Sequence, residues 1–446
     1  MLTRICLGLL LIASAPLWCQ VNASAPESGT TAGTDSDSRM FTPAPVSGES
    51  YSAETASEAR SNYLSGGISF TSAYMDNALA TANGHEISDV SYSISPMLAL
   101  DETTGRFHST LTYSPGFTFY QRDSSFNEAD QNLGLGLQYR LSPHVTVSFH
   151  DAFHKTSDLF NQPDFALSNP VSGTVQAPSV AVISPIGDVL SNSGNGEITY
   201  QFSPHGMIGA SGNFSNLHYS STGEFAGLSD GSSQGGGAFY TYRLSKKHYI
   251  GAQYQYGRSL SSLTGTQYDT ETHTIFLFYS LYLNPHFSIS FSGGPQYSDT
   301  MQGSFASQSW SPAAGASFGW QARHTSLSGS YSRLVSGGGG LVGAFHSNSA
   351  SFSARQLVAK TWSISAGANY SIYQTLTPFF FLANPGGHSI SGTVSIQRQF
   401  GQHMSFQAGY TRLHQSYGEV AAIATTPDTN RESISISYHF TRPIGR

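Results

Sequence analysis

The chain has 446 residues, a formal net charge of -7 and only 11% charged residues, against roughly 25% in ordinary soluble proteins. It has no apolar run of 18 or more residues after the N-terminus, which excludes a helical membrane protein but not a β-barrel, whose apolar residues are hidden by alternation. Because no run of basic residues is longer than two, nucleic acid is excluded as a ligand.

Residues 1–23 read as a secretory signal peptide. An apolar stretch follows Arg4, and small residues suitable for cleavage come after it. We place the cut after Ala23, which removes both cysteines, Cys6 and Cys19, and leaves no thiol for a disulfide, a nucleophile or a metal site. Residues 24–61 are mainly small and polar, with almost no large apolar residue, so they predict a flexible periplasmic lead-in without a core.

Residues 62–446 predict one β domain. Apolar and polar residues alternate on both sides of the Ser142-Pro143-His144 turn, which is the signature of two antiparallel strands. Imperfect copies of this hairpin recur, most of them at spacings of roughly 36 to 43 residues. The alternation predicts about 18 strands, with 16 or 20 as alternatives, at residues 63–74, 88–100, 105–121, 130–141, 144–156, 195–203, 206–219, 234–244, 247–260, 269–283, 286–298, 308–322, 325–334, 346–358, 361–373, 388–400, 403–415 and 431–441.

The predicted connections alternate in length. Each strand is near the ~9 to 11 residues that a tilted strand needs to cross a bilayer. Short turns on one side, long loops on the other and an even strand number place both ends of the domain in the periplasm. We therefore predict an all-β fold, a transmembrane antiparallel up-and-down β-barrel. The short turns lie at Ser142, Ser203, Ser245, Asn284, Ala322, Lys360 and Gly401.

The cleavable leader, the alternating strands, the loop asymmetry and the ending Tyr438-x-Phe440 resemble a Gram-negative outer-membrane porin. This resemblance implies the outer membrane as the location, with its lipid and its assembly machinery as partners. The strand number and the Ser/Thr/Gly-rich hairpins are loosely similar to β-barrel porins associated with exopolysaccharide export, which would imply a periplasmic polysaccharide-export partner. One departure is that residues 441–446 extend beyond the aromatic residue on which outer-membrane proteins usually end.

The alternation also predicts the residues that face the interior. A barrel of about 18 strands is too wide for side chains alone to fill, so water or a loop occupies it. The predicted wall is mainly Ser, Thr, Gly, Gln and Asn, which suits neutral or weakly acidic sugars better than strongly ionic solutes. The alternative interpretation is that small polar residues merely line any wide barrel and indicate no class of solute. The larger residues predicted to line the pore are Arg106, His108, Arg122, Arg140, His150, His154, Arg243 and Arg355.

The longest predicted loop covers residues 157–193. Loops of this length are usually functional or disordered. We predict that it folds into the barrel and constricts it, and that Asp158, Asp164 and Asp188 are the acidic residues of the constriction. A lid lying over the mouth is the alternative.

No residue pattern predicts catalysis, a cofactor or a metal. His150 and His154 are four residues apart, but on a strand that spacing is about 13 Å, too far for one zinc ion. Asp151 between them falls on the lipid-facing side, which requires a bulge or a position outside the hydrocarbon. We predict a channel for hydrophilic solutes, with saccharides or exported exopolysaccharide as candidates, and not an enzyme. An outer-membrane hydrolase and a non-conducting structural or adhesive barrel remain the alternatives.

Overall fold

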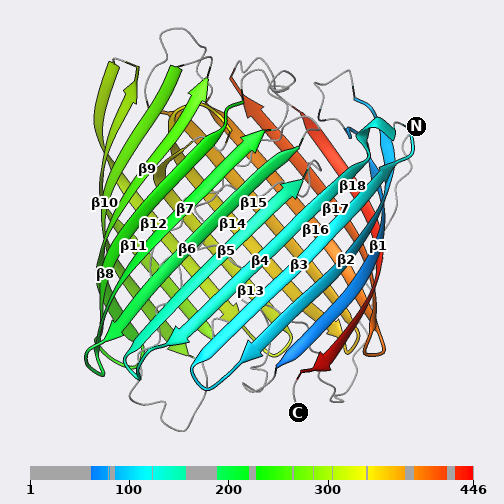
Figure 1. Cartoon of the computed structure of the whole chain (residues 1–446), viewed down its shortest axis with the longest axis horizontal. Helices are drawn as coiled ribbons and strands as arrows, with labels where there is room; N and C mark the ends of the chain where they lie inside the picture. The colour runs from blue at the N-terminus through cyan, green and yellow to red at the C-terminus, as the bar shows by residue number, and fades with distance from the viewer. Residues whose placement is uncertain are drawn as a thin grey trace.

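The structure is a computed structural model that describes residues 62–444 except 79, 81–85, 123, 157–187, 220–227, 264–265, 285, 304, 338–339, 377–385 and 419–426. The predicted leader and lead-in, and Asp158 and Asp164, lie outside the described residues. The described chain forms one 18-stranded antiparallel sheet, which closes because β1 pairs with both β2 and β18 (Figure 1). The predicted barrel and its strand number are confirmed. The strands are β1 (Tyr63–Met75), β2 (Asp89–Thr103), β3 (Phe107–Tyr120), β4 (Glu128–Arg140), β5 (Val145–Thr156), β6 (Val189–Gln201), β7 (Gly206–Tyr219), β8 (Gly231–Arg243), β9 (His248–Leu263), β10 (Thr266–Asn284), β11 (Phe287–Gln302), β12 (Phe305–Gln321), β13 (Thr325–Gly337), β14 (Ala344–Ala359), β15 (Trp362–Thr375), β16 (Gly387–Phe400), β17 (Met404–Tyr417) and β18 (Asp428–Pro443).

The repeated hairpin motif builds one end of the barrel, which we call the turn end. Ser142 and Val145 exchange two backbone hydrogen bonds of 3.3 Å, and Ser142 Oγ accepts the amide N–H of His144 at 3.2 Å. Turns at Ser203 and Ser245 repeat this geometry. Neighbouring hairpins are also joined to each other at the turn end. In each case the backbone carbonyl of the residue just before a strand accepts an N–H from the neighbouring hairpin, at 2.7 or 2.8 Å. These donor–acceptor pairs are Arg140–Arg106, Gln201–His144, Arg243–His205, Tyr282–Lys247, Gln321–His286, Leu357–His324, Gln399–Thr361 and His439–His403.

The opposite end, which we call the loop end, differs from the prediction in two places. The strands β9 to β12 are 16, 19, 16 and 17 residues long and project as a lip (Figure 1). Longer connections were predicted between every pair of hairpins, but only residues 264–265 join β9 to β10 and only 303–304 join β11 to β12. The predicted loop 157–193 is also shorter than expected, because β6 already begins at Val189.

The strand register separates an outward from an inward face, since directly paired residues share a face. One outward row runs across five strands through Phe406, Ile436, Phe70, Ile94 and Phe117. Large apolar side chains of this kind are exposed around the barrel, as expected for a surface in lipid, where a closed sheet leaves no backbone group unpaired. In the described part of the chain, no helix is long and apolar enough to span a membrane.

Asp151 interrupts the outward apolar surface. It pairs with Leu135 on β4 and with Gly194 on β6, and neither pairing shows a shift in register. The predicted explanation by a bulge is therefore wrong. A position outside the hydrocarbon stays a prediction.

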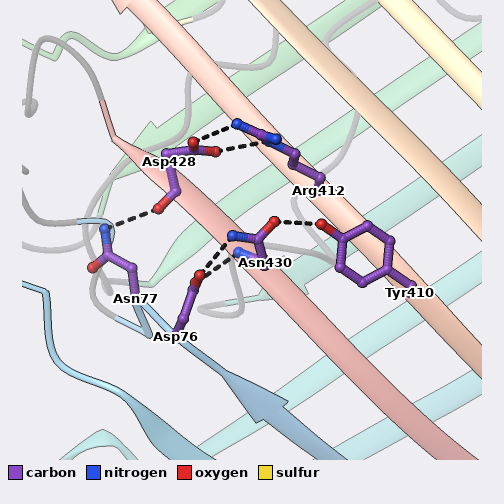
Figure 2. Close-up of polar contacts among 6 residues, drawn as sticks. All are labelled: Asp76, Asn77, Tyr410, Arg412, Asp428 and Asn430. Atoms are coloured by element: carbon purple, nitrogen blue, oxygen red, sulfur yellow. Dashed lines mark hydrogen bonds and ion pairs between the residues drawn. The ribbon is translucent and has the colours of Figure 1, made fainter. Parts of the chain in front are cut away.

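The seam between β1 and β18 carries a polar cluster on its outward face at the loop end (Figure 2). Asp76 accepts hydrogen bonds from the backbone N–H and from Nδ2 of Asn430, at 2.7 and 2.6 Å. Arg412 on β17 donates from Nε and Nη2 to the carboxylate of Asp428, at 3.1 and 2.6 Å. Tyr410 donates to Asn430 Oδ1 at 2.6 Å. These bonds tie the first strand to the last two where the barrel closes.

Candidate channel lumen

The inward face is divided into three walls, and the first, on β2 to β6, is the charged wall. His108 Nε2 lies 3.1 Å from Asp101 Oδ1, and His154 Nδ1 lies 2.8 Å from Asn132 Oδ1. His150 pairs with Gly136 on the same inward face. This wall therefore places several titratable groups along one side of the lumen.

The residues predicted to line the pore are not gathered at one point. His108, Arg140, His150 and His154 are at inward positions of β3 to β5, and Arg106 precedes β3 in an exposed turn. Arg122 lies just beyond β3, where Nη1 donates to the Ser88 carbonyl at 2.8 Å. The last two are at inward positions of other strands, Arg243 on β8 and Arg355 on β14. Their role in lining a pore stays a prediction.

The second wall, on β13 to β18, is the hydroxyl wall. Its inward serines form hydrogen-bonded pairs across neighbouring strands. In each pair one hydroxyl donates to the other, and a hydroxyl that lies exposed can also exchange hydrogen bonds with water or a solute. Ser328, Ser332 and Ser347 are buried, whereas their partners are partly exposed. The pairs are Ser328–Ser353 at 2.7 Å, Ser330–Ser351 at 2.8 Å, Ser332–Ser349 at 2.9 Å, Ser336–Ser347 at 2.6 Å and Ser365–Ser395 at 2.7 Å.

The third wall, on β7 to β11, is the aromatic wall. Phe276 is fully buried although it faces the interior, and the Phe278 ring covers Gly251, its direct partner. Tyr249 and Tyr282 pack edge to face with ring centroids 5.4 Å apart. Tyr282 therefore packs on the inward face. The sequence signal for this covered wall is the apolar run of residues 275–283, which only Ser280 interrupts, because a strand that is apolar on both faces is covered on both.

A short segment, Gly340–Gly343, crosses the inner face at the loop end, and we call it the transverse segment. It connects β13 to β14 and bonds to Ser229, just before β8, and to β9. The Gly340 carbonyl accepts the N–H of Ser229 at 2.9 Å, and Gly343 N–H donates to Ser261 Oγ on β9 at 3.2 Å. The φ angles of Gly340 and Gly343 are 104° and 97°, a region that favours glycine. A Cβ on Gly340 would also overlap the Tyr219 hydroxyl.

Leu341 anchors the transverse segment. Only 1% of its surface is exposed, because it packs in an apolar cluster drawn from opposite sides of the barrel. Apolar side chains that meet across a lumen exclude water from the space between them. The loop-end mouth is therefore narrowed in the described structure. The other members of the cluster are Val189, Leu217, Tyr219, Leu228, Phe345, Tyr373 and Tyr417.

A small cavity of about 90 Å³ remains between the transverse segment and the wall formed by β8 to β10. Its lining includes Ser233, Ser259 and Thr270 together with Leu341. This volume holds only a few water molecules. The route for any larger solute therefore lies elsewhere in the lumen or requires the segment to move.

Of the predicted acidic constriction, only Asp188 lies within the described residues. Asp188 Oδ2 forms an ion pair with Lys155 Nζ at 2.9 Å, and both side chains are more than a third exposed at the loop-end rim. Lys155 is at an outward position of β5, paired with Gln131. Whether Asp158, Asp164 and Asp188 contribute to a constriction stays a prediction.

The histidines give no sign of a hydrolytic pair. Within the described ranges, their side chains hydrogen-bond to carboxylates, an amide, tyrosine hydroxyls and a backbone carbonyl, and none to a serine hydroxyl. The same residues contain no group of three or more His, Cys, Asp or Glu side chains placed to hold a metal ion. These described side chains offer hydrogen-bonding and charged groups to the lumen.

No protein-family model and no curated protein matches the chain. Solved structures with a similar barrel include the ferric citrate transporter FecA in its unliganded form, at 10% identity and a TM-score of 0.42, covering 87% of this chain and 66% of that one. OccK2 (OpdF) of Pseudomonas aeruginosa has 10% identity and a TM-score of 0.42, with 84% and 98% covered. OccAB4 of Acinetobacter baumannii also has 10% identity and a TM-score of 0.42, with 86% and 99% covered. Structural similarity at this identity and TM-score is not evidence for a particular function.

Proposed function

We propose that the protein is an outer-membrane channel for small hydrophilic solutes. The observation that carries this proposal is the contrast between an apolar outward face and two polar inward walls, the charged wall and the hydroxyl wall, in one closed barrel. A passive channel selects by diameter, by the hydrogen bonds of its wall and by its field, and needs no catalytic residue. The transverse segment sets the diameter at the loop-end mouth.

Saccharides are the solute class that the hydroxyl wall suits best. Uncharged hydroxyls can exchange hydrogen bonds with water for hydrogen bonds with sugar at little net cost, which permits passage rather than tight binding. Exported exopolysaccharide is the narrower proposal. It additionally requires the transverse segment to leave the lumen, because a polymer needs a continuous path from one mouth to the other.

Planar-bilayer recording of the purified full chain tests the channel, and swelling of vesicles in isosmotic sugar solutions tests the solute class. We expect ion conductance and a swelling rate that falls as the sugar becomes larger. The same recordings and swelling assays are made with the Leu341→Ser variant, in which the transverse segment is loosened. If neither protein conducts, the channel proposal is wrong and the non-conducting barrel takes its place.

A further inference from the structure

The outward and turn positions of the turn end are basic. Arg398 and Arg442 are at outward strand positions, since they pair with Trp362 and Leu64, and both are exposed. Exposed lysines and an arginine in the turns add to this charge. At these positions, Glu102 is the only acidic residue in the part of the chain that the structure describes. We call the following five residues the basic rim: Lys246, Arg323, Lys360, Arg398 and Arg442.

Three outward cations towards the loop end are arranged differently, because carboxylates neutralise them. Lys155 pairs with Asp188 at 2.9 Å, as described above. Arg258 Nη2 lies 2.6 Å from Asp269 Oδ2, and Arg412 Nη2 lies 2.6 Å from Asp428 Oδ2. In contrast, no carboxylate of the described residues pairs with Lys360, Arg398 or Arg442.

Arg398 has a preorganised position within the basic rim. Its guanidinium carbon lies 5.1 Å from the centroid of the Trp362 ring and 4.6 Å from that of Phe400. Stacking on aromatic faces holds a guanidinium but leaves the N–H groups in its plane available, and these match two oxygens of a phosphate. Lys360 lies two residues before Trp362 and brings a second cation to the same part of the rim.

The aromatic residues also fix the depth of this site. Tryptophan and other aromatic residues of membrane barrels lie at the level of the lipid headgroups. The anion present at that depth is the lipid phosphate, and basic side chains near an anionic leaflet each contribute about 1 kcal/mol of attraction.

We propose that the basic rim binds the phosphate groups of anionic phospholipids in the adjoining leaflet, with Lys360 and Arg398 as its principal site. The proposal does not depend on conduction. A barrel without an open pore would bind the same lipid through the same outward residues.

The test uses full-length protein in which Trp362 is the only tryptophan, reconstituted in vesicles that contain brominated phosphatidylglycerol or brominated phosphatidylcholine. Bromine quenches tryptophan fluorescence only at contact distance, so quenching reports which lipid occupies the site. We expect a preference of about fivefold or more for phosphatidylglycerol, since fivefold corresponds to about 1 kcal/mol, the attraction of a single basic residue. The preference should fall as salt is added.

Trp310 provides the matched control. It is outward, 72% exposed and at the loop end, where its partner on β11 is Tyr297. Protein with Trp310 as the only tryptophan should show a lipid preference near one. The combined substitutions Lys360→Gln and Arg398→Gln should reduce the preference at Trp362 to the same level.

Three results would overturn the proposal. One is equal quenching of Trp362 by the two lipids, and another is a preference that the double substitution does not change. The third concerns residues 24–61, which carry six acidic and two basic residues and enter β1 at the turn end. If phosphatidylglycerol is preferred only after these residues are deleted, the occupant of the rim is this acidic segment and not lipid.

Discussion

The aromatic wall and the hydroxyl wall have the same backbone structure but opposite surfaces. Both are inward faces of long antiparallel strands in one barrel. On the aromatic wall, Phe276 and Tyr249 are at most 1% exposed. On the hydroxyl wall, Ser351 and Ser365 stay partly exposed beside their paired serines.

The difference shows how a wide barrel is partly filled. Apolar side chains on an inward face stabilise the fold only when other side chains cover them, whereas hydroxyl groups can remain in contact with water. The end of β13 reaches over the interior towards the aromatic wall, where Leu334 packs with Phe276 and Ala313, and Val335 N–H donates to Gln296 Oε1 at 2.8 Å. We therefore expect the aromatic wall to determine stability and the hydroxyl wall to determine permeation.

The largest expected effect is Gly294→Ala, next to the aromatic wall. A Cβ at Gly294 would overlap the backbone carbonyl oxygen of Ile275 on β10, which cannot move without breaking the ladder. We expect failure to form the heat-resistant barrel, measured by the gel mobility of unboiled samples. Overpacking of this kind costs about 1–3 kcal/mol where side chains can yield, and more where backbone must.

Gly367→Ala on the hydroxyl wall is the matched control for that substitution. The atom nearest to its added Cβ is Thr393 Oγ1 at 3.2 Å, which a rotation of the threonine can relieve. We expect normal gel mobility. Equal damage at the two glycines would show that the walls do not differ in tolerance.

Removal of a buried ring should have the second largest effect. Phe276→Ala leaves a cavity among Leu334, Ala313 and the strand backbone, so we expect the free energy of unfolding to fall by about 3–5 kcal/mol. Urea unfolding in lipid vesicles measures it. A loss below about 1 kcal/mol would mean that water already reaches this ring and that the wall is not a packed surface.

Alternation predicted the strand number and most of the faces because each strand is exposed to lipid on one side and to polar contents on the other. It failed where that premise failed. Around Phe276 and Phe278 both faces are apolar, so the period-2 signal vanishes. It also left the cause of the Asp151 interruption open, and the unshifted register there excludes a bulge.

The transverse segment could not be predicted from local pattern. Glycines before Leu341 indicate a turn, but whether a turn lies over the mouth or inside it depends on a partner across the lumen. That partner, Tyr219, is more than a hundred positions away in the chain, and only the closed barrel brings the two together. The predicted constriction by residues 157–193 stays a prediction, because residues 157–187 lie outside the described residues.

Loosening the transverse segment should change permeation more than stability. Leu341→Ser removes a buried leucine from the apolar cluster, and losses of this type weaken packing by about 2–5 kcal/mol. A shift of that size moves a two-state equilibrium by a factor of about 30 or more. We expect frequent openings of larger conductance in bilayer recordings. Leu98→Ser, exposed at an outward position of β2, should leave the recordings unchanged, and equal conductance of the two variants would contradict a gating segment.

The smallest effect belongs to the serine pairs and measures whether the hydroxyl wall is wet. Ser330 and Ser351 share one hydrogen bond of 2.8 Å. If water reaches both hydroxyls, each loses little when its partner becomes alanine, and a double-mutant cycle of Ser330→Ala and Ser351→Ala gives a coupling energy below about 0.5 kcal/mol. If the pair is dry, the hydroxyl left alone costs about 1–3 kcal/mol in each single variant, and the double variant recovers most of it. The cycle, read from urea unfolding, therefore decides whether solute on this side of the lumen meets a hydrated surface or a packed one.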